Sequence, residues 1–268
     1  MTETATETPV RPRVAPRPPS GSPSQRTILL PTAAVALAVA VWWAVTDLLA
    51  PPSSMVASFS PWRALPAVVE LAARGVLLDD VLTSLWRLLV GLAIASVLGL
   101  AVGLAVGWWN AVETASRPIV QFLRMISPLS WAPVAIGVFG IGHAPVFFLV
   151  AAAAVWPVVL STAAGVRSLD PGLLLVARSL GADRREVLTS VVAPALRPHV
   201  LTGLRLALGI GWVVLVPAEM LGVTSGLGYE ILNARDQLAY DQVIAVILVI
   251  GVLGYALDAL ARRALARG

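Results

Sequence analysis

The sequence predicts an all-α, polytopic transmembrane bundle of about six spans, with one short helical hairpin outside the membrane. Hydrophobic residues make up 58% of the 268 residues and charged residues only 13%, whereas soluble domains average about 45–50% and about 25%. A water-soluble surface cannot be built from so few charges. Since one crossing of a hydrocarbon core about 30 Å thick needs about 20 apolar residues, the chain can cross several times with short connections.

Residue types that the chain lacks exclude several kinds of site. All 19 basic residues are arginine, and there is no cysteine. Without cysteine there are no disulfides or thiolate metal sites, and His143 and His199 are too isolated to suggest a metal site. Without lysine, the chain cannot form a phosphate-binding loop of the G-x-x-x-x-G-K-[ST] type. We therefore expect no metal and no cofactor on this chain, and any ATP hydrolysis belongs to another polypeptide.

The amino-terminal part divides into a tail, a span and a surface helix. Residues 1–27 are rich in Pro, Ser, Thr and Arg, a composition that predicts a disordered tail. The apolar stretch 28–49 is longer than the 7–15 residues, roughly, of a signal-peptide core, so it is predicted to be a retained span. Charges return in residues 61–80, where Glu70 and Arg74 are four residues apart. This spacing places opposite charges on one helix face, and we expect a helix beside the membrane.

The second span is predicted at about residues 88–108, with Asp79 or Asp80 placed to cap the helix that leads into it. Small residues recur in this span every four positions: Gly91, Ala95, Gly99, Gly103 and Gly107. Such a row forms a groove in which another helix can approach closely in lipid. We expect the four glycines to be helix-packing positions; the alternative is that they are merely tolerated in lipid.

The remaining spans are predicted at about residues 125–141, 144–163, 201–221 and 243–260. The third of the six carries Pro128 and Pro133, and prolines in mid-membrane free carbonyls that must be satisfied inside protein or in a wet cavity. We therefore expect this helix to be interior. Pro128, Trp131 and Pro133 are candidates for a gate near the membrane midplane, although tryptophan is also common at membrane interfaces.

The distribution of arginine predicts the orientation. With the amino terminus inside, six spans place the tail, residues 109–124, residues 164–200 and the carboxyl terminus in the cytoplasm, and these regions hold most of the arginines. The opposite side keeps Arg63, Arg74 and Arg235, with Arg87 near that boundary. This asymmetry follows the positive-inside rule. It also accounts for the basic pI without a nucleic-acid partner.

The connection 164–200 carries its own helix signals. Asp170-Pro171 is an N-cap followed by proline, and Gly181 stands where that helix would end. Asp183 and Glu186 have capping-box spacing, and an apolar stripe follows before Pro194. We expect two short helices joined at Gly181, with Arg178, Arg184 and Arg185 on the exposed face. An ordinary hairpin covering the bundle is the alternative, whereas a DNA-reading helix-turn-helix is disfavoured because the segment is tethered between two spans.

This segment resembles the cytoplasmic loop of the inner-membrane permeases of bacterial ABC importers, which carries the motif E-A-A-x-x-x-G-A-x(8)-I-x-L-P. The chain matches this motif at Ala177, Gly181, Ala182 and Pro194, with Val191 in place of the isoleucine. It departs from the motif at Leu175, Val176 and Ala193. Leu175 has no carboxylate, so it cannot form a salt bridge that the family's glutamate would make.

The resemblance covers roughly residues 50–265 and is greatest to the nitrate, sulfonate and taurine branch of these permeases. The motifs that carry it are Ser84-x-x-Arg87-x-x-x-Gly91, Pro128-x-x-Trp131-Ala-Pro133, Thr202-Gly-Leu-Arg205, Glu219-Met220 and Ser225-Gly-Leu-Gly228-Tyr229. Each motif is weak alone. Their order and spacing together are specific.

The resemblance implies a permease subunit that moves a small sulfonate-, nitrate- or taurine-like solute from a binding protein to the cytoplasm by alternating access. It implies a homodimer in the bacterial inner membrane with both termini cytoplasmic, two ATP-binding subunits that hold ATP and Mg²⁺, and an extracytoplasmic solute-binding protein. Residues 28–268 would then be the permease domain and 164–200 its coupling loop. The implied coupling residues are Ala177, Arg178, Gly181, Ala182, Asp183, Arg184, Arg185, Glu186, Val191 and Pro194.

One carboxylate, Glu219, lies well inside a predicted span. Because intramembrane charges are costly, Glu219 either lines the transport path or pairs with an arginine such as Arg205. A bare carboxylate suits an anion path poorly, which favours the structural role or an uncharged or zwitterionic solute. Asp258 is expected to pair with Arg262, four residues on.

Two other classes of function remain as alternatives. The runner-up is a secondary transporter driven by an ion gradient through Glu219 and Asp258, which inverted repeats would support; the sequence shows no convincing repeat. A membrane-embedded enzyme would need a cluster of nucleophile, base or metal ligands, and no such cluster is visible in the sequence.

Overall fold

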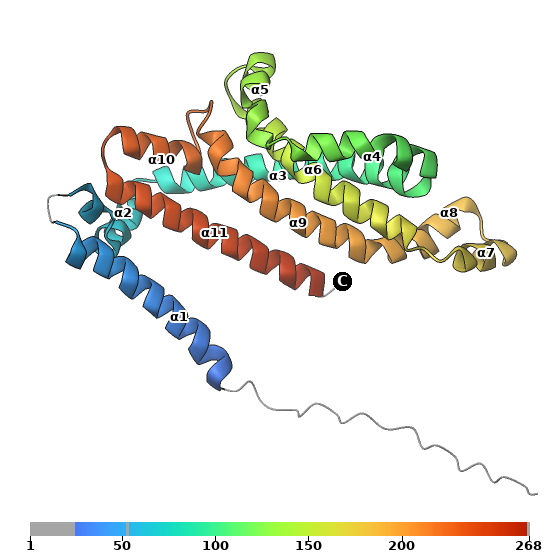
Figure 1. The fold of residues 1–268 in the computed structure, drawn as a ribbon, viewed down its shortest axis with the longest axis horizontal. Helices are drawn as coiled ribbons and strands as arrows, with labels where there is room; N and C mark the ends of the chain where they lie inside the picture. Colours follow the sequence, from blue (N-terminus) through green and yellow to red (C-terminus); the bar gives the residue numbers. More distant parts are fainter. Residues whose placement is uncertain (1–24, 52–53, 267–268) are drawn as a thin grey trace, which may run out of the picture.

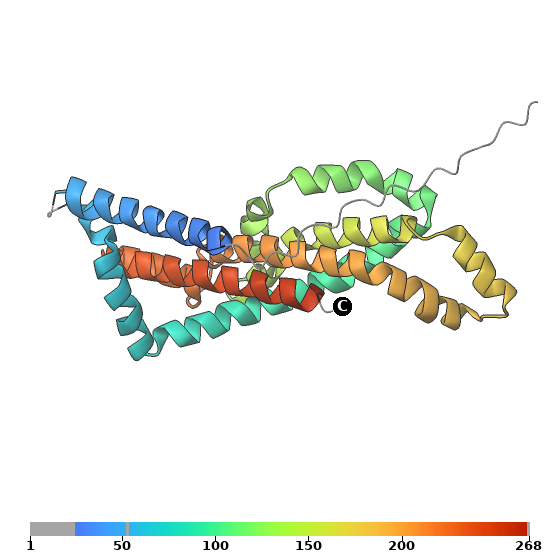
Figure 2. The same ribbon diagram turned by 90° about the horizontal axis from the view of Figure 1, so that it is seen from below.

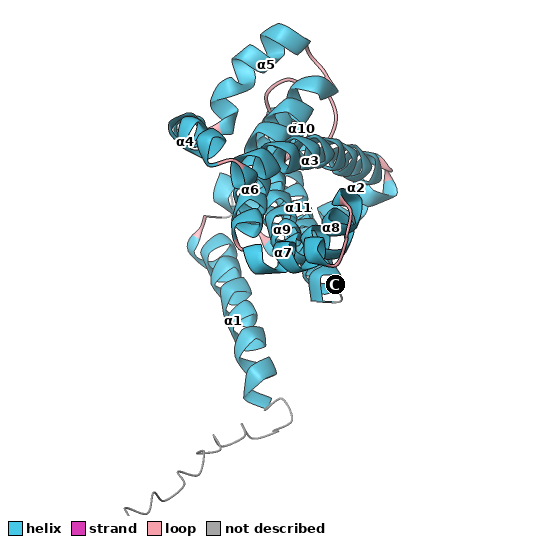
Figure 3. Ribbon diagram, turned by 90° about the vertical axis from the view of Figure 1, so that its right-hand side faces the viewer, coloured by secondary structure: helices cyan, strands magenta, loops and turns pink. Residues whose placement is uncertain are grey.

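The computed structural model describes residues 25–51 and 54–266, and every regular element in these ranges is a helix (Figures 1 and 3). The first span consists of α1 (Gln25–Trp43) and a π turn, η1 (Ala44–Leu49). Residues 1–24 of the predicted tail lie outside the described residues. Residues 25–27, also assigned to the tail, instead belong to α1.

The predicted surface helix is shorter than expected. After η2 (Met55–Phe59), α2 (Pro61–Ala73) begins with Ser60 as its N-cap. Gly75 adopts the left-handed conformation at φ +77° and turns the chain, which glycine does without steric cost. Residues 76–80 therefore belong to α3 (Val76–Trp108), a helix that begins well before the predicted second span.

The glycine row of α3 lies against α6 (His143–Arg167). A Cβ atom on Gly91, Gly99, Gly103 or Gly107 would lie 2.6–2.7 Å from the Cβ of Val150, Val158, Thr162 or Val166, respectively. Only a hydrogen fits at such a distance, so the close approach depends on glycine. The same number of residues separates the members of each pair, which shows that α3 and α6 run parallel.

Two parallel helices require a return crossing between them. That segment contains α4 (Asn110–Met125), η3 (Pro128–Trp131) and α5 (Ala132–Phe139), and it bends by 88° between α4 and η3. The described residues hold five helices long and apolar enough to cross a membrane, or six with this bent pair. Because the bent pair connects parallel helices, we count it as the third crossing.

The prediction of a continuous third span at residues 125–141 was wrong. Residues 109–124, predicted as a cytoplasmic connection, form most of α4, and the helix breaks between Met125 and Pro128. Pro128 has no N–H to donate, and proline also disfavours the helical conformation of the residue before it. The proline therefore lies at a corner of the chain, as the first residue of η3, and not inside α4.

The second half of the chain consists of α7 (Pro171–Ser179), α8 (Arg184–Val187), η4 (Leu188–Val192), α9 (Ala193–Glu219), α10 (Leu227–Asp236) and α11 (Tyr240–Ala266). Gly165 faces His199, and Gly203 faces Ser161, so α6 and α9 are antiparallel. Gly254 of α11 packs against the Trp212 indole of α9.

The core lies between α3, α6 and α9, with α11 along the outer side of α9 (Figures 1 and 2). Its largest fully buried apolar side chains include Leu88, Leu149 and Leu215. The helices α3, α6 and α11 run toward the α7–α8 hairpin, while α1 and α9 run away from it. The hairpin projects from one end of the bundle (Figure 2).

Candidate functional site

The first helix of the hairpin has the predicted caps at both ends. Asp170 accepts a hydrogen bond from the Gly172 N–H at 2.8 Å, and Pro171 occupies the first turn. At the other end, the Gly181 N–H donates to the Arg178 carbonyl at 3.0 Å, and Ala182 N–H to Ala177 at 3.1 Å. Gly181 has φ +85°, the left-handed conformation that glycine favours after a helix.

The predicted capping box opens the second helix. Asp183 Oδ1 accepts from the Glu186 N–H at 2.7 Å, and Glu186 Oε2 accepts from the Asp183 N–H at 2.9 Å. These reciprocal bonds satisfy two N–H groups that have no partner within the helix. The corner between the two helices is therefore fixed by hydrogen bonds on both sides of Gly181.

The expectation of a separate short second helix before Pro194 was wrong. The π turn η4 connects α8 directly to α9, and residues Arg184–Glu219 form one helical stretch of 36 residues. Proline has no N–H, and its ring clashes with the carbonyl four residues earlier, here Ser190. The wider turn, in which the Ala193 N–H bonds to the Leu188 carbonyl, accommodates Pro194 without ending the helix.

The surface of the hairpin is both basic and apolar. Arg178, Arg184 and Arg185 are exposed, as expected. Leu175 and Leu180 are also exposed, with Leu180 at 83%. The exposure of Leu175 was not predicted from the sequence. A signal was present, because four consecutive large apolar residues, 173–176, cannot all face inward from a single helix.

The inner side of the hairpin packs on the bundle. Val187, Val192 and Leu196 form a buried cluster with Val166 of α6. Ala177 and Ala182, from the predicted coupling set, pack against this cluster. Next to it, a hollow of about 650 Å³ is lined by residues that include Trp108 at the end of α3 and Arg184. The hairpin is thus held against α6 and α9.

At the far end of α9, Glu219 forms a buried ion pair with Arg87 of α3. The Arg87 Nη1 atom donates to Glu219 Oε1 at 2.8 Å, and the two side chains are 1% and 0% exposed. The suggested partner Arg205 was wrong, because Arg205 pairs with Asp258, which also pairs with Arg262 as expected. Both carboxylates that an ion-driven transporter would use are therefore in ion pairs.

Arg87 also holds the loop between α9 and α10. Its Nη1 donates to the Ser225 carbonyl at 2.7 Å, and its Nη2 to Ser225 Oγ at 2.9 Å. Its Nε donates to Nδ1 of His143, the first residue of α6, at 3.0 Å. All three guanidinium nitrogens are used, so one side chain joins α3, α6, α9 and the loop.

The start of α10 is held by further side chains of α3 and α9. Asp80 accepts from the Gly226 N–H at 2.7 Å, and Ser84 accepts from the Leu227 N–H at 2.9 Å. The Gly228 N–H donates to Glu219 Oε2 at 3.0 Å. These N–H groups lie at a helix amino terminus, where a carboxylate is favourable.

Steric limits explain the two glycines of the Ser225–Tyr229 motif. Gly226 has φ +98°, and a Cβ there would lie 2.5 Å from Glu219 Oε1. A Cβ on Gly228 would lie 2.2 Å from the Val216 carbonyl oxygen. The motif is thus required by the packing of this loop over the ion pair.

A further carboxylate lies one turn into α10, outside the predicted spans. Glu230 is buried and accepts from the Asn233 amide at 3.0 Å. Burial raises the pKa of Glu230, the Asn233 bond lowers it in part, and the nearby Asp80 carboxylate raises it further. Both Asp80 and Glu230 are thus buried carboxylates beside this loop.

The four candidate gate residues do not meet at one place. Pro128 and Trp131 line a hollow of about 170 Å³ together with Phe148 and Trp156 of α6. Pro133 is exposed at the start of α5. Glu219 is not among the residues that line this hollow. Of the two roles that the sequence left open for Glu219, its hydrogen bonds favour the structural one.

The chain is similar in sequence to permease proteins of binding-protein-dependent transport systems. Residues 95–267 match the family described as "Binding-protein-dependent transport system inner membrane component". The taurine transport system permease protein TauC of Escherichia coli (strain K12) is 36% identical over 256 residues, which cover 91% of this chain and 90% of TauC. The bicarbonate transport system permease protein CmpB of Synechococcus elongatus is 37% identical over 179 residues, covering 66% of this chain and 64% of CmpB.

A solved structure supports the fold. A chain of the MetNI methionine ABC transporter in inward-facing conformations superposes with a TM-score of 0.54 at 17% sequence identity. The match covers 68% of this chain and 93% of that chain. At this identity the likeness concerns the fold alone.

Proposed function

Because the chain belongs to the family of binding-protein-dependent transport system inner membrane components and is a permease subunit of an ABC importer, we propose that its α7–α8 hairpin receives the motion of a separate ATP-binding subunit. The motion then passes along α9 and opens the transport path alternately to the two sides of the membrane. The solute comes from an extracytoplasmic binding protein.

One observation carries this proposal: the hairpin and the buried ion pair lie at opposite ends of one helical stretch, Arg184–Glu219. At about 1.5 Å per residue, this stretch is about 54 Å long, more than the roughly 30 Å of a hydrocarbon core. A continuous helix transmits a displacement that a flexible loop would absorb. Movement at Arg184 is thus expected to reach Glu219, Arg87 and the loop that they hold.

The hairpin has a rigid corner and an exposed surface of apolar and basic side chains that a partner protein can bind. Gly181 and the capping box keep the corner rigid, and the exposed Leu175 and Leu180 provide apolar contact beside the exposed arginines. Interfaces are typically an apolar centre with a polar rim. Since the chain has no lysine for a phosphate-binding loop, ATP and Mg²⁺ are assigned to that partner.

The orientation proposed from the arginines agrees with this assignment. In Figure 1, the end of α11 and the start of α1 are the ends of these two helices that lie nearer the hairpin. We place the hairpin end of the bundle in the cytoplasm of a bacterial cell, with the chain multi-pass in the inner membrane and both termini inside. The loop around Ser225 then faces the extracytoplasmic side, where a binding protein would dock.

The remaining assembly follows the family. We propose two copies of this chain, each with one ATP-binding subunit. Pro128 and Trp131 are proposed to form a gate, because they lie at the bend of the third crossing beside a hollow.

The solute is proposed to be a small molecule with an oxyanion group, because taurine carries a sulfonate and bicarbonate is itself an oxyanion. A bare Glu219 would have opposed an anion path. The ion pair with Arg87 removes this objection, since the carboxylate is neutralised and fully buried.

Purification of the complex through an affinity tag on this chain tests the proposal. The wild-type chain is expected to bring down an ATPase activity and, in proteoliposomes, to support ATP-dependent uptake. Gly181→Asp adds a side chain where φ is +85°, and Arg184→Glu reverses an exposed charge. Both are expected to weaken ATPase association and uptake.

A matched control uses an arginine at the same end of the bundle. Arg263 is exposed near the end of α11, away from the hairpin, so Arg263→Glu is expected to leave the association intact. If no ATPase activity copurifies, or if Gly181→Asp and Arg184→Glu behave like the control, the proposal is wrong.

A further inference from the structure

Helix α4 has its polar face turned toward the protein and its apolar face turned outward. Its inner face lines a hollow of about 360 Å³ against α3 and α6, and consists of Glu113, Ser116, Arg117, Val120, Gln121 and Arg124. Its large apolar side chains Ile119, Phe122 and Met125 are instead 59%, 68% and 70% exposed. This is the reverse of an amphipathic helix in a water-soluble protein.

The reversal indicates a wet interior. In a membrane protein, apolar side chains can face lipid, whereas charged side chains within a crossing face the bundle interior or a water-filled cavity. Helix α4 belongs to the bent pair that makes the third crossing. Its charged face is therefore expected to border water inside the protein and not lipid tails.

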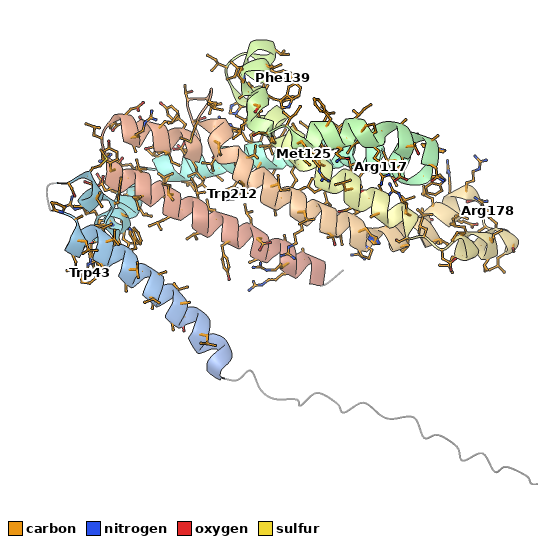
Figure 4. All side chains as sticks on the ribbon, viewed as in Figure 1. Trp43, Arg117, Met125, Phe139, Arg178 and Trp212 are labelled. Atoms are coloured by element: carbon orange, nitrogen blue, oxygen red, sulfur yellow. The ribbon has the colours of Figure 1, made fainter. Side chains whose placement is uncertain are left out.

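The hollow carries a net positive charge. Arg167 at the end of α6 pairs with Glu113 at 2.9 Å. Arg117 and Arg124, which also line the hollow, make no ion pair within residues 25–51 and 54–266. The other walls include the apolar Val106, Val159 and Leu160. Arg117 and Arg124 are exposed, so two guanidinium groups without an ion-pair partner border an open hollow of mixed polar and apolar lining, with Arg117 between α4 and α6 (Figure 4).

We propose that Arg117 and Arg124 bind the oxyanion group of the transported solute in this hollow. A guanidinium group presents a planar fork of N–H donors that matches two oxygens of a sulfonate, carbonate or nitrate group. A cleft lined by one sign of charge also raises the local concentration of the opposite ion. This inference rests on the proposed function, which it deepens by naming the residues that receive the solute.

The position of the hollow assigns it a place along the path. On α6, the hollow is lined from Val159 to Arg167, toward the hairpin. The smaller hollow beside Pro128 and Trp131 is lined by Phe148 to Trp156 on the same helix. The solute would therefore pass the bend first and reach the arginines afterwards, on the cytoplasmic side.

A lipid phosphate has the same oxyanion chemistry, and the experiment separates the two sources. The tagged complex is reconstituted in vesicles of phosphatidylcholine alone and in vesicles that also contain phosphatidylglycerol. Uptake is measured with taurine and with nitrate, and ATPase activity is measured in the same samples. Binding of radiolabelled taurine is measured separately on the complex in detergent.

Arg117→Gln with Arg124→Gln is expected to lower uptake about tenfold or more in both kinds of vesicle and to abolish taurine binding. ATPase activity should stay near the wild-type rate, since the hairpin is unchanged. Arg117→Lys with Arg124→Lys keeps the charge and should restore part of the uptake. Arg263→Gln removes an arginine at the same end of the bundle and should change nothing.

Unchanged binding and uptake in the double glutamine variant would overturn the inference. A defect seen only in vesicles with phosphatidylglycerol would also overturn it, because the arginines would then serve lipid headgroups. A wild-type complex that binds taurine through these arginines but shows no ATP-dependent uptake would support the site and contradict the proposed function. The two failures are thus distinguishable.

Discussion

Arg87 and Glu219 meet at 2.8 Å although 132 residues separate them in the sequence. They come from α3 and α9, and both are buried. Through Ser225, Gly226, Leu227 and Gly228, whose backbone groups bond to the side chains around this pair, they fix the end of α9 that lies farthest from the hairpin. The ion pair therefore fixes one end of the helical stretch Arg184–Glu219, which is proposed to transmit the motion of the hairpin.

Loss of one partner of this pair should be costly. Glu219→Ala leaves the Arg87 charge buried without its counter-ion, and such a change typically costs about 3–5 kcal/mol. We expect a large drop in unfolding temperature in detergent. The double variant Arg87→Met with Glu219→Leu should lose less than Glu219→Ala, because no unpaired charge remains.

The half-exposed pair of Arg205 and Asp258 serves as the control. Exposed pairs contribute about 0–1 kcal/mol, so Arg205→Ala should shift the unfolding temperature only slightly. Equal shifts for Glu219→Ala and Arg205→Ala would contradict the structural role of the buried pair.

The loop over the ion pair should not accept a methyl group. Gly226→Ala combines a left-handed backbone at φ +98° with a contact of 2.5 Å to Glu219, so we expect a loss of stability of about 1–3 kcal/mol or more. Gly251→Ala is the matched control, because a Cβ at this position of α11 meets nothing within 4 Å. Thermal unfolding of both variants should separate them clearly, and equal curves would argue against the packing described.

The contact between α3 and α6 predicts a compensating pair of substitutions. Gly99→Ala places a Cβ 2.6 Å from the Cβ of Val158, an overpacking that typically costs about 1–3 kcal/mol. Val158→Gly alone should cost about 1.5–3 kcal/mol, because Val158 is fully buried, and roughly 1 kcal/mol more for glycine in a helix. Because it also makes room for the new Cβ, the double variant should lose less stability than the sum of the two single variants. Losses that simply add would contradict the pairing of these positions.

Features that depend on neighbouring residues could be predicted from the sequence. The hairpin caps at Asp170, Gly181 and Asp183 are of this kind, because a cap needs only side chains and backbone within one turn. Most crossings were also predicted at the right place, since an apolar run of sufficient length is a local property. The residues at which the helices begin and end were predicted less accurately. For example, α3 begins at Val76, well before the predicted start of the second span.

Features that depend on the three-dimensional context could not be predicted. The partner of Glu219 was missed because Arg87 is distant in sequence, although an arginine in an apolar stretch was a signal that it needed a counter-ion. The two prolines were also predicted wrongly: a continuous helix was expected through Pro128, where the chain bends, and a helix end was expected before Pro194, where the helix continues. A proline breaks one helix and is accommodated by a π turn in the other, and the sequence alone does not distinguish these outcomes.

The central claim is that the hairpin moves α9 as one rigid stretch, and a flexible joint in η4 tests it most directly. Thr189 and Ser190 are exposed residues of η4. Thr189→Gly with Ser190→Gly weakens the helix there by about 1 kcal/mol per residue and leaves the hairpin surface unchanged. Thr189→Ala with Ser190→Ala changes the same positions but favours the helix.

The measurement is ATP-dependent uptake alongside ATPase activity in proteoliposomes of the copurified complex. We predict that the glycine variant keeps its ATPase partner and hydrolyses ATP but loses most of its uptake, whereas the alanine variant resembles the wild type. Uptake by the glycine variant at the wild-type rate, with the same ATP consumption, would contradict the claim that α9 transmits the motion.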